Sequence, residues 1–339
     1  DRPHAATYLG AGKIDELRLK VIEAQASLVV FDDELSPSQA KNIEDAIGQR
    51  VVDRAELILD IFATRARSAE AKMQVELAQL EYMLPRLTRM WTHLEKFRGG
   101  IGVRGPGETQ LETDRRLISH RIKLLREKLR EFQKGRAVQR QGRRGEFKAS
   151  LVGYTNAGKS SLLRELSGAS EVFVEDRLFA TLDPLTREVD LGENSKALVT
   201  DTVGFIRKLP HHLVASFRAT LEEAREADLL LHVIDASHVM WEEQREVVEG
   251  VLRDLELHER PVLLVFNKVD LLDEQALLAL QERMASDGQE AVFVSTVAPH
   301  GTDPLRRALQ GAVRLRRPLA EINLSPSDGK LLAEIHEYG

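Results

Sequence analysis

The eight residues from Gly153 to Ser160, Gly-Tyr-Thr-Asn-Ala-Gly-Lys-Ser, have the composition and spacing of a phosphate-binding loop. Its glycines let consecutive backbone N–H groups turn toward one centre, where they can donate hydrogen bonds to phosphate oxygens. Lys159 adds a mobile positive charge, and the Ser160 hydroxyl can bind Mg²⁺. The loop therefore predicts a bound nucleotide without identifying the base.

A second segment, Asn267-Lys-Val-Asp270, identifies the base. The Asp270 carboxylate can accept two hydrogen bonds, one from N1–H and one from the exocyclic N2–H₂ of guanine. Adenine does not offer donors in that arrangement. The phosphate-binding loop and this segment together predict a guanine nucleotide, GTP or GDP.

Residues between and after these motifs are expected to contact the metal, the third phosphate and the base. The Asp201 carboxylate can hold Mg²⁺ through a water molecule, and the N–H of Gly204 can bond the γ-phosphate. Thr181 is the candidate second direct Mg²⁺ ligand beside Ser160, in a loop expected to order when a γ-phosphate is present. The loop that starts at Ser295 is expected to close over guanine through main-chain groups. The predicted GTP-binding residues are Gly153, Tyr154, Thr155, Asn156, Ala157, Gly158, Lys159, Ser160, Ser161, Phe179, Ala180, Thr181, Leu182, Asp183, Asp201, Thr202, Val203, Gly204, Asn267, Lys268, Val269, Asp270, Ser295, Thr296 and Val297.

Phe205 occupies the position where many GTPases carry the glutamine that orients the attacking water. A phenyl ring has no donor or acceptor, so we expect slow intrinsic hydrolysis unless another group supplies this role. One candidate is Asn156, because in some GTPases with asparagine at this position a K⁺ ion neutralises transition-state charge. Asn156 is equally well explained as a turn residue, and a partner that completes the site is the other candidate. The predicted catalytic residues are Lys159, Asn156, Thr181 and Gly204.

The elements that must position these residues follow from apolar runs at 149–152, 197–200, 229–234, 262–266 and 291–294. Each run precedes a polar loop and then a helical pattern, which predicts a mostly parallel sheet covered on both faces. Every nucleotide motif falls in a loop at the carboxyl end of a predicted strand, where a doubly wound sheet binds its ligand. The fold class is therefore α/β, of the P-loop GTPase type.

The preceding segment has the pattern of two long helices. Apolar residues at 73, 77, 80, 84, 87, 91 and 94 alternate four- and three-residue steps, and residues 118, 122, 125, 129 and 132 share this spacing. Two such helices joined by a short loop predict an antiparallel hairpin, with a glycine-rich loop at 98–112. Pro85 lies inside the first helix, where it should remove one backbone hydrogen bond and produce a kink.

These patterns divide the chain into four predicted parts. Residues 1–53 read as a partial N-terminal α/β subdomain, with strands at 28–31 and 51–52 and a helix that begins at Ser36-Pro37. Residues 54–146 form the helical hairpin, 147–317 the GTP-binding domain, and 318–339 the start of a truncated C-terminal domain.

Composition and charge narrow the class of protein further. The chain has 339 residues, of which 42% are hydrophobic, and no apolar run is long enough for stable membrane insertion. Its zero cysteines exclude disulfides and fit a cytoplasmic location. The net charge is −6, yet residues 98–148 contain 15 Lys and Arg against 6 Asp and Glu. Such a basic segment on an acidic protein suggests a polyanionic partner.

The motifs resemble those of a known family. The run Gly-Gly-Ile-Gly-Val-Arg-Gly-Pro-Gly-Glu-Thr-Gln-Leu-Glu-Thr-Asp-Arg-Arg at 99–116 directly precedes the basic helix. Together with the phosphate-binding loop, residues 178–184 and residues 201–206, it resembles the HflX family of translation-associated GTPases, from about Tyr8 onward. The resemblance implies a GTPase that binds the large ribosomal subunit and dissociates stalled or idle ribosomes under stress. Ribosomal particles would stimulate its hydrolysis of GTP to GDP and phosphate.

The same resemblance makes ribosomal RNA the expected polyanion, since a hairpin with a glycine-rich tip could enter an RNA cleft. Two alternatives stay open: a ribosome-assembly GTPase that acts on immature subunit RNA, and a GTP switch that docks a protein partner through the hairpin. We expect a monomer. The predicted RNA contacts are Arg98, Arg104, Arg115, Arg116, Arg121, Lys123 and Arg126.

Overall fold

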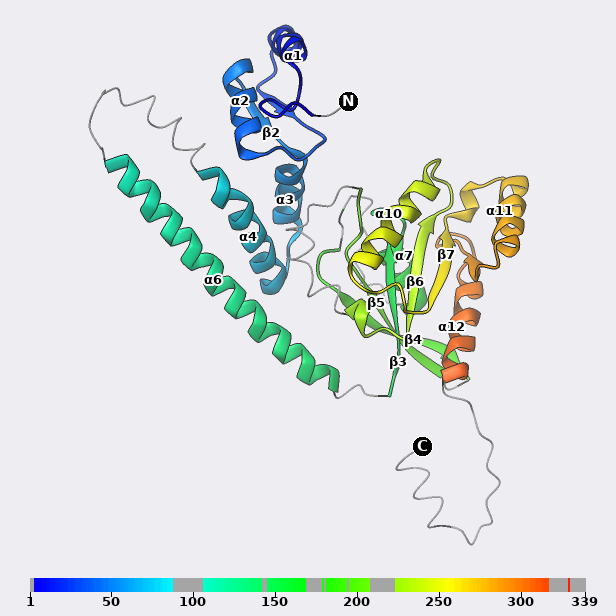
Figure 1. The fold of residues 1–339 in the computed structure, drawn as a ribbon. Helices are drawn as coiled ribbons and strands as arrows, with labels where there is room; N and C mark the ends of the chain where they lie inside the picture. Colours follow the sequence, from blue (N-terminus) through cyan, green and yellow to red (C-terminus); the bar gives the residue numbers. More distant parts are fainter. Residues whose placement is uncertain are drawn as a thin grey trace.

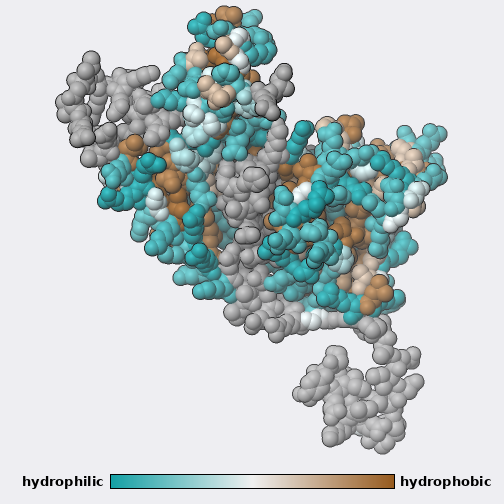
Figure 2. Space-filling model, viewed as in Figure 1, coloured by the Kyte–Doolittle hydropathy of each residue, from teal (hydrophilic) through white to brown (hydrophobic). Residues whose placement is uncertain are grey.

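The computed structural model describes residues 3–87, 106–141, 145–168, 179, 181–193, 195–207, 223–316 and 329. Figure 1 shows a small N-terminal part in blue, two helices lying side by side in cyan and green, and a sheet flanked by helices. In the view of Figure 2, hydrophilic residues cover most of the described surface of the sheet-containing part. Within the described ranges, no helix is long and apolar enough to cross a membrane.

A six-stranded sheet forms the centre of the larger part, with the order β4-β5-β3-β6-β7-β8. All neighbouring pairs are parallel except β4 and β5, which are antiparallel. The predicted P-loop GTPase fold with a mostly parallel sheet is therefore confirmed. The strands are β3 (Phe147–Gly153), β4 (Leu185–Gly192), β5 (Ser195–Asp201), β6 (Leu229–Asp235), β7 (Val262–Asn267) and β8 (Ala291–Phe293).

Strand β4 was not predicted from the sequence. It lies at the edge of the sheet, and in the run Leu-Thr-Arg-Glu-Val-Asp-Leu-Gly only Val189 is buried. An edge strand with one solvated face lacks the continuous apolar run that identifies a central parallel strand. The pattern used for the other five strands could not detect it.

Helices cover both faces of the sheet. On one face, α7 (Lys159–Ser167) and α12 (Asp303–Arg316) pack against the side chains of Leu229, Leu231 and Val233. On the other face, α10 (Trp241–Asp254) and α11 (Glu274–Ser286) pack against the alternate residues of the same strand. This alternation is what a β-strand buried on both sides requires.

The N-terminal part has a small core of its own. The two predicted strands are present as β1 (Leu28–Val30) and β2 (Arg50–Val52), which pair in parallel and lie beside α1 (Ala11–Glu23) and α2 (Pro37–Ile47). The predicted start of α2 is confirmed in detail, because the Ser36 side chain accepts a hydrogen bond from Gln39 N in a capping box.

Three helices follow: α3 (Arg54–Arg65), α4 (Ala69–Met83) and α6 (Pro106–Gln141). Helices α4 and α6 run antiparallel (Figure 1), and most of their predicted heptad residues meet in one apolar seam, whereas Phe132 is exposed. This seam contains Met73, Leu77, Leu80 and Leu84 of the first segment and Ile118, Ile122, Leu125 and Leu129 of the second. The heptad residues at 91 and 94 lie outside the described residues.

Two details of the predicted hairpin were wrong. Pro85 does not kink a continuous helix: α4 ends at Met83, and Leu84–Arg86 form a 3₁₀ turn, η1, because proline cannot continue the helical hydrogen bonds. The glycine-rich loop does not extend to residue 112, since α6 already begins at Pro106. Proline at the first helical position is pre-organised for a helix, and only one glycine follows it before a run of better helix formers.

Candidate nucleotide-binding site

The predicted nucleotide motifs converge at the carboxyl ends of β3, β5, β7 and β8. The loop after β3 approaches its neighbours closely: a side chain on Gly153 would overlap the carbonyl of Val233, and one on Gly158 would overlap the Asn267 amide. Gly158 also has a φ of +93°, which favours glycine. Asn267 Nδ2 donates a hydrogen bond to the carbonyl of Ala157 at 2.9 Å. The base motif therefore braces the phosphate-binding loop directly.

Lys159 begins α7 and lies buried beneath the loop. Its Nζ donates to the carbonyl oxygens of Gly153 and Tyr154 at 3.1 and 2.9 Å. Burial lowers the pKa of Lys159 to about 8, and the nearby Asp201 carboxylate opposes the shift. The ammonium group is thus held between loop carbonyls at the start of a helix, where backbone N–H groups and the helix dipole favour an anion.

Three oxygen-bearing side chains meet beside Lys159. Ser160 Oγ donates to Asp201 Oδ2 at 2.6 Å, Thr181 Oγ1 donates to the same oxygen at 2.8 Å, and the two hydroxyls lie 2.8 Å apart. Asp201 is 1% exposed, and its Oδ1 has no hydrogen-bond partner among the described residues. Burial raises the pKa of Asp201, while Lys159 and the two hydroxyl donors oppose the rise. Hard oxygen donors around one acidic centre are the set that Mg²⁺ prefers, so these residues fit the ion.

The segment after Asp201 pairs with the phosphate-binding loop through its backbone. Phe205 N donates to the Gly153 carbonyl at 3.0 Å, and Thr155 N donates to the Phe205 carbonyl at 2.8 Å. The Phe205 ring is fully buried in the core, where it has no access to a water molecule. A Cβ on Gly204 would lie 2.9 Å from Thr155 Cα, so this position needs glycine for close approach.

Lys268 and Asp235 form a second brace on the base side. Lys268 Nζ donates to the carbonyl of Asn156 at 2.9 Å and to Asp235 Oδ2 at 2.7 Å. Asp235 was not among the predicted residues, although it ends β6 at the same edge of the sheet as the other motifs. Its position at a strand's carboxyl end is the signal that could have identified it. Asp270 is exposed, at the edge where the base is expected.

Asn156 and Ser295 have local roles that the sequence only partly indicated. Asn156 has a φ of 63° and is exposed, so its backbone adopts the left-handed conformation that asparagine tolerates well. Ser295 Oγ accepts hydrogen bonds from Val297 N and Ala298 N at 3.2 and 3.1 Å. The serine side chain therefore holds its own loop, which leaves main-chain groups for contact with a ligand.

The predicted RNA contacts fall into three groups. Arg98 and Arg104, like the predicted GTP contact Ala180, lie outside the described residues. Arg121 forms a two-pronged ion pair with Glu76 of α4, at 2.7 and 2.9 Å, and Arg126 pairs with Glu81 at 2.7 Å. The remaining contacts are exposed on α6: Arg115, Arg116 and Lys123.

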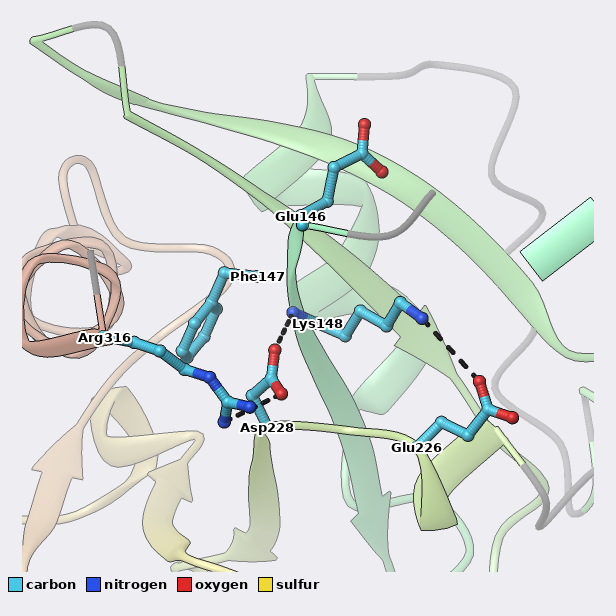
Figure 3. Close-up of a pocket in the computed structure, with 7 residues that line it drawn as sticks. Glu146, Phe147, Lys148, Glu226, Asp228 and Arg316 are labelled. Atoms are coloured by element: carbon cyan, nitrogen blue, oxygen red, sulfur yellow. Dashed lines mark hydrogen bonds and ion pairs between the residues drawn. The ribbon is translucent and has the colours of Figure 1, made fainter. Parts of the chain in front are cut away.

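A hollow of about 340 Å³ lies away from these motifs, near the start of β3 and the end of α12 (Figure 3). Four of its charged side chains form two ion pairs. Lys148 N donates to Asp228 Oδ2 at 2.9 Å, Arg316 lies 2.8 Å from Asp228 Oδ1, and Lys148 Nζ lies 3.7 Å from Glu226. The hollow lies between the start of β3 and the end of α12. None of the predicted nucleotide contacts line it.

Comparisons with known proteins agree with this arrangement. Residues 1–63 match the family described as GTP-binding GTPase N-terminal, 65–143 the GTP-binding GTPase middle region, and 148–268 the 50S ribosome-binding GTPase family. The GTPase HflX of Magnetococcus marinus is 48% identical over 98% of this chain and 76% of the relative. The GTPase HflX of Escherichia coli is 46% identical over 99% of this chain and 78% of the relative. The chain spans 65% of the length of a third relative, the GTPase HflX of Flavobacterium psychrophilum, at 54% identity.

Solved structures show the same fold. A GTP-binding protein from Sulfolobus solfataricus in complex with GDP has a TM-score of 0.50 at 25% identity, covering 93% of this chain and 88% of that protein. The complex of SsGBP with GDP has a TM-score of 0.53 at 25% identity, covering 93% and 89%.

Proposed function

Because this chain belongs to the HflX family of GTPases, we propose that it binds the large ribosomal subunit and dissociates stalled or idle ribosomes. Ribosomal particles stimulate its hydrolysis of GTP to GDP and phosphate. The observation that carries this proposal is the meeting of Ser160, Thr181 and Asp201 at the start of α7, in a chain whose α6 presents exposed basic residues. The protein acts as a monomer in the cytoplasm, where its substrate is found.

In this proposal each residue of the site has a defined task. Asp270 selects guanine through its carboxylate, and Asn267 keeps the phosphate-binding loop in place through Ala157. Lys159 turns from the loop carbonyls toward the phosphates and neutralises their charge. The hydroxyls of Ser160 and Thr181, which here donate to Asp201, would hold Mg²⁺, and the ion would neutralise phosphate charge.

Hydrolysis needs a group that Phe205 does not supply. Its ring is buried, and its backbone is already paired with the phosphate-binding loop. We propose that the ribosomal particle completes the site, with K⁺ beside Asn156 as the second candidate. The left-handed backbone of Asn156 accounts for asparagine without an ion. GTP turnover compared in K⁺ and Na⁺ separates the two: faster turnover in K⁺ supports the ion, and equal rates remove it from the mechanism.

The RNA-binding surface in this proposal is narrower than the full set of basic residues. Arg121 and Arg126 flank the apolar seam and pair with α4, so their first role is to hold the hairpin together. Arg115, Arg116 and Lys123 remain as the contacts that neutralise phosphates. Each neutralised phosphate releases counterions, so binding weakens as salt rises.

The proposal is tested by mixing the protein with intact ribosomes and a non-hydrolysable GTP analogue and separating the particles on a density gradient. We expect free subunits, with the protein comigrating with the large one. Intact ribosomes at saturating protein overturn the splitting activity and favour ribosome assembly. Protein that comigrates with no ribosomal particle overturns ribosome binding and favours a switch for a protein partner.

A further inference from the structure

The loop that carries Thr181 is attached to helices that lie outside the GTPase fold. Ser68, the N-cap residue of α4, donates from its backbone N–H to Asp183 Oδ2 at 3.1 Å. Its hydroxyl donates to the other carboxylate oxygen, Oδ1. Asp183 is two residues after Thr181, so the carboxylate anchors the loop just beyond the predicted metal ligand.

An apolar anchor holds the same loop on the other side of Thr181. Phe179 is 3% exposed, and its ring packs edge-on against Phe62 of α3 with centroids 4.6 Å apart. Leu182, between Thr181 and Asp183, is also 3% exposed and belongs to the same buried cluster as residues of α3 and α4. Phe179 has a φ of 56°, a conformation that a bulky residue adopts only when its surroundings hold it there.

The loop that carries Gly204 has a parallel attachment. Arg54, the first residue of α3, donates from Nη2 to the carbonyl of Arg207 at 2.9 Å. Phe205 and Ile206 are buried in the cluster that contains Phe62 and Phe179. Both loops expected to contact the third phosphate therefore rest on helices α3 and α4.

These two helices form a firm support. Asp53, the N-cap of α3, is 2% exposed and accepts hydrogen bonds from Glu56 N at 2.9 Å and from the Tyr82 hydroxyl of α4 at 2.8 Å. Arg86 donates to the same carboxylate at 3.3 Å and to the Leu35 carbonyl at 2.7 Å. A buried carboxylate that accepts hydrogen bonds from several elements helps to fix their relative position.

We propose that Ser68 is a positioning residue for the triphosphate-bound site, which acts through Asp183 to hold Thr181 where its hydroxyl can ligate Mg²⁺. This proposal rests on the proposed GTP site. It adds to that site a determinant of GTP affinity that lies at the start of α4, in the hairpin. A loop held in place before the ligand arrives loses less conformational freedom on binding. The contact therefore favours GTP with Mg²⁺ over GDP, which lacks the phosphate next to Thr181.

Four variants separate this role from the capping of α4. Asp183→Ala removes the acceptor and leaves the cap intact. Ser68→Asp keeps a good N-cap residue but places a second carboxylate against Asp183. Ser68→Thr retains both the cap and the hydroxyl donor. Ser36→Ala is the matched control, because Ser36 also caps its helix by accepting from the backbone N–H three residues on, and among the described residues its hydrogen bonds reach none of the nucleotide loops.

The experiment measures binding of a fluorescent non-hydrolysable GTP analogue and of fluorescent GDP across a titration of Mg²⁺. We expect Asp183→Ala and Ser68→Asp to weaken binding of the analogue in Mg²⁺ by about fivefold to tenfold, which corresponds to the net contribution of a typical hydrogen bond. Both variants should need more Mg²⁺ for half-maximal binding, with GDP affinity changed by less than about twofold. Ser68→Thr and Ser36→Ala should match the wild type.

Three results would contradict the account. If the wild type binds both nucleotides and Asp183→Ala and Ser68→Asp bind the analogue equally well, the positioning role of Ser68 is wrong. If the variants bind the analogue and GDP more weakly by the same factor, the contact is merely structural and the proposal is again overturned. If the wild type binds neither guanine nucleotide, the proposed GTP site itself fails.

Discussion

The nucleotide site and the helical hairpin use charged side chains in opposite ways. In the site, polar groups from several loops point toward one another, and short contacts to backbone atoms fix most of them, as Asn267 shows with Ala157. On α6, basic side chains lie along one exposed helix, and two of them pair with acidic residues of α4. A residue in the site therefore has one geometric role, whereas a basic residue on the hairpin can serve the fold or a partner.

The largest change in affinity is expected in the nucleotide site, where each residue has one geometric role. Asp270→Asn replaces two acceptor oxygens with one oxygen and an amide donor, which opposes the N–H groups of guanine. Because one charge-assisted hydrogen bond is lost, the other loses its charge, and the amide N–H₂ faces a guanine N–H, GDP affinity should fall by at least about 100-fold. Calorimetric titration with GDP measures this, and xanthosine diphosphate, whose C2 carries an oxygen, should bind the variant better than the wild type. Unchanged GDP affinity would remove Asp270 from base recognition.

A smaller effect is expected on the hairpin, where single charges act through solvent. The double variant Arg116→Glu, Lys123→Glu should weaken binding to large ribosomal subunits by about tenfold or more at physiological salt. It should also flatten the dependence of the logarithm of affinity on the logarithm of salt concentration. The measurement is subunit binding at three salt concentrations. The same affinity and slope as the wild type would show that this face of α6 is only a solvated surface.

In the nucleotide-binding part, one buried histidine should make the free energy of unfolding fall in mild acid. His232 is 1% exposed in β6, and burial, with Arg245 and Lys159 adding to it, lowers its pKa to about 3. Its neutral form is therefore favoured in the folded state, and its contribution to stability is complete above its ordinary pKa of 6.5. As pH falls below 6.5, the unfolded state gains a proton that the folded state does not, so stability falls.

Between pH 6 and pH 5 this contribution amounts to about 1 kcal/mol. Urea unfolding of the wild type and of His232→Leu at the two pH values measures it. We expect the variant to lose less stability across this interval, whatever its stability at pH 7. An identical pH dependence in both proteins would mean that His232 does not remain neutral in the folded state.

The smallest effect is expected from exchanging an ion pair inside the hairpin. In the double variant Glu76→Arg, Arg121→Glu, the pair is reversed and the total charge is unchanged. If Arg121 serves the hairpin, affinity for the large subunit should stay within about twofold of the wild type, because the exposed face of α6 keeps its charges. A loss as large as that of the Arg116 and Lys123 variant would show that Arg121 contacts RNA.

These differences explain what the sequence could predict. Motifs such as Gly153–Ser160 need particular residues at fixed steps, because a side chain in place of Gly153 or Gly158 would overlap a neighbour. The five strands with continuous apolar runs were found for a similar reason, since burial on both faces leaves little choice of residue.

The features that sequence reasoning missed depend on tertiary contacts. Strand β4 has one solvated face, and Asp235 becomes part of the site only through Lys268, which arrives from the next strand. The pairing of Arg121 with Glu76 could not be read from a basic segment, because only the packing of α4 on α6 decides which arginines are engaged. The turn at Pro85 depends in the same way on how the chain leaves α4.

The central claim is that the basic hairpin binds the large ribosomal subunit and that this binding stimulates hydrolysis at the guanine-nucleotide site. GTP turnover, measured with no addition, with large subunits and with small subunits, tests it most directly. We predict slow turnover alone, because Phe205 cannot orient water, and strong stimulation by large subunits only, which Arg116→Glu, Lys123→Glu reduces. Turnover that large subunits leave unchanged, or that the variant retains in full, would contradict the account.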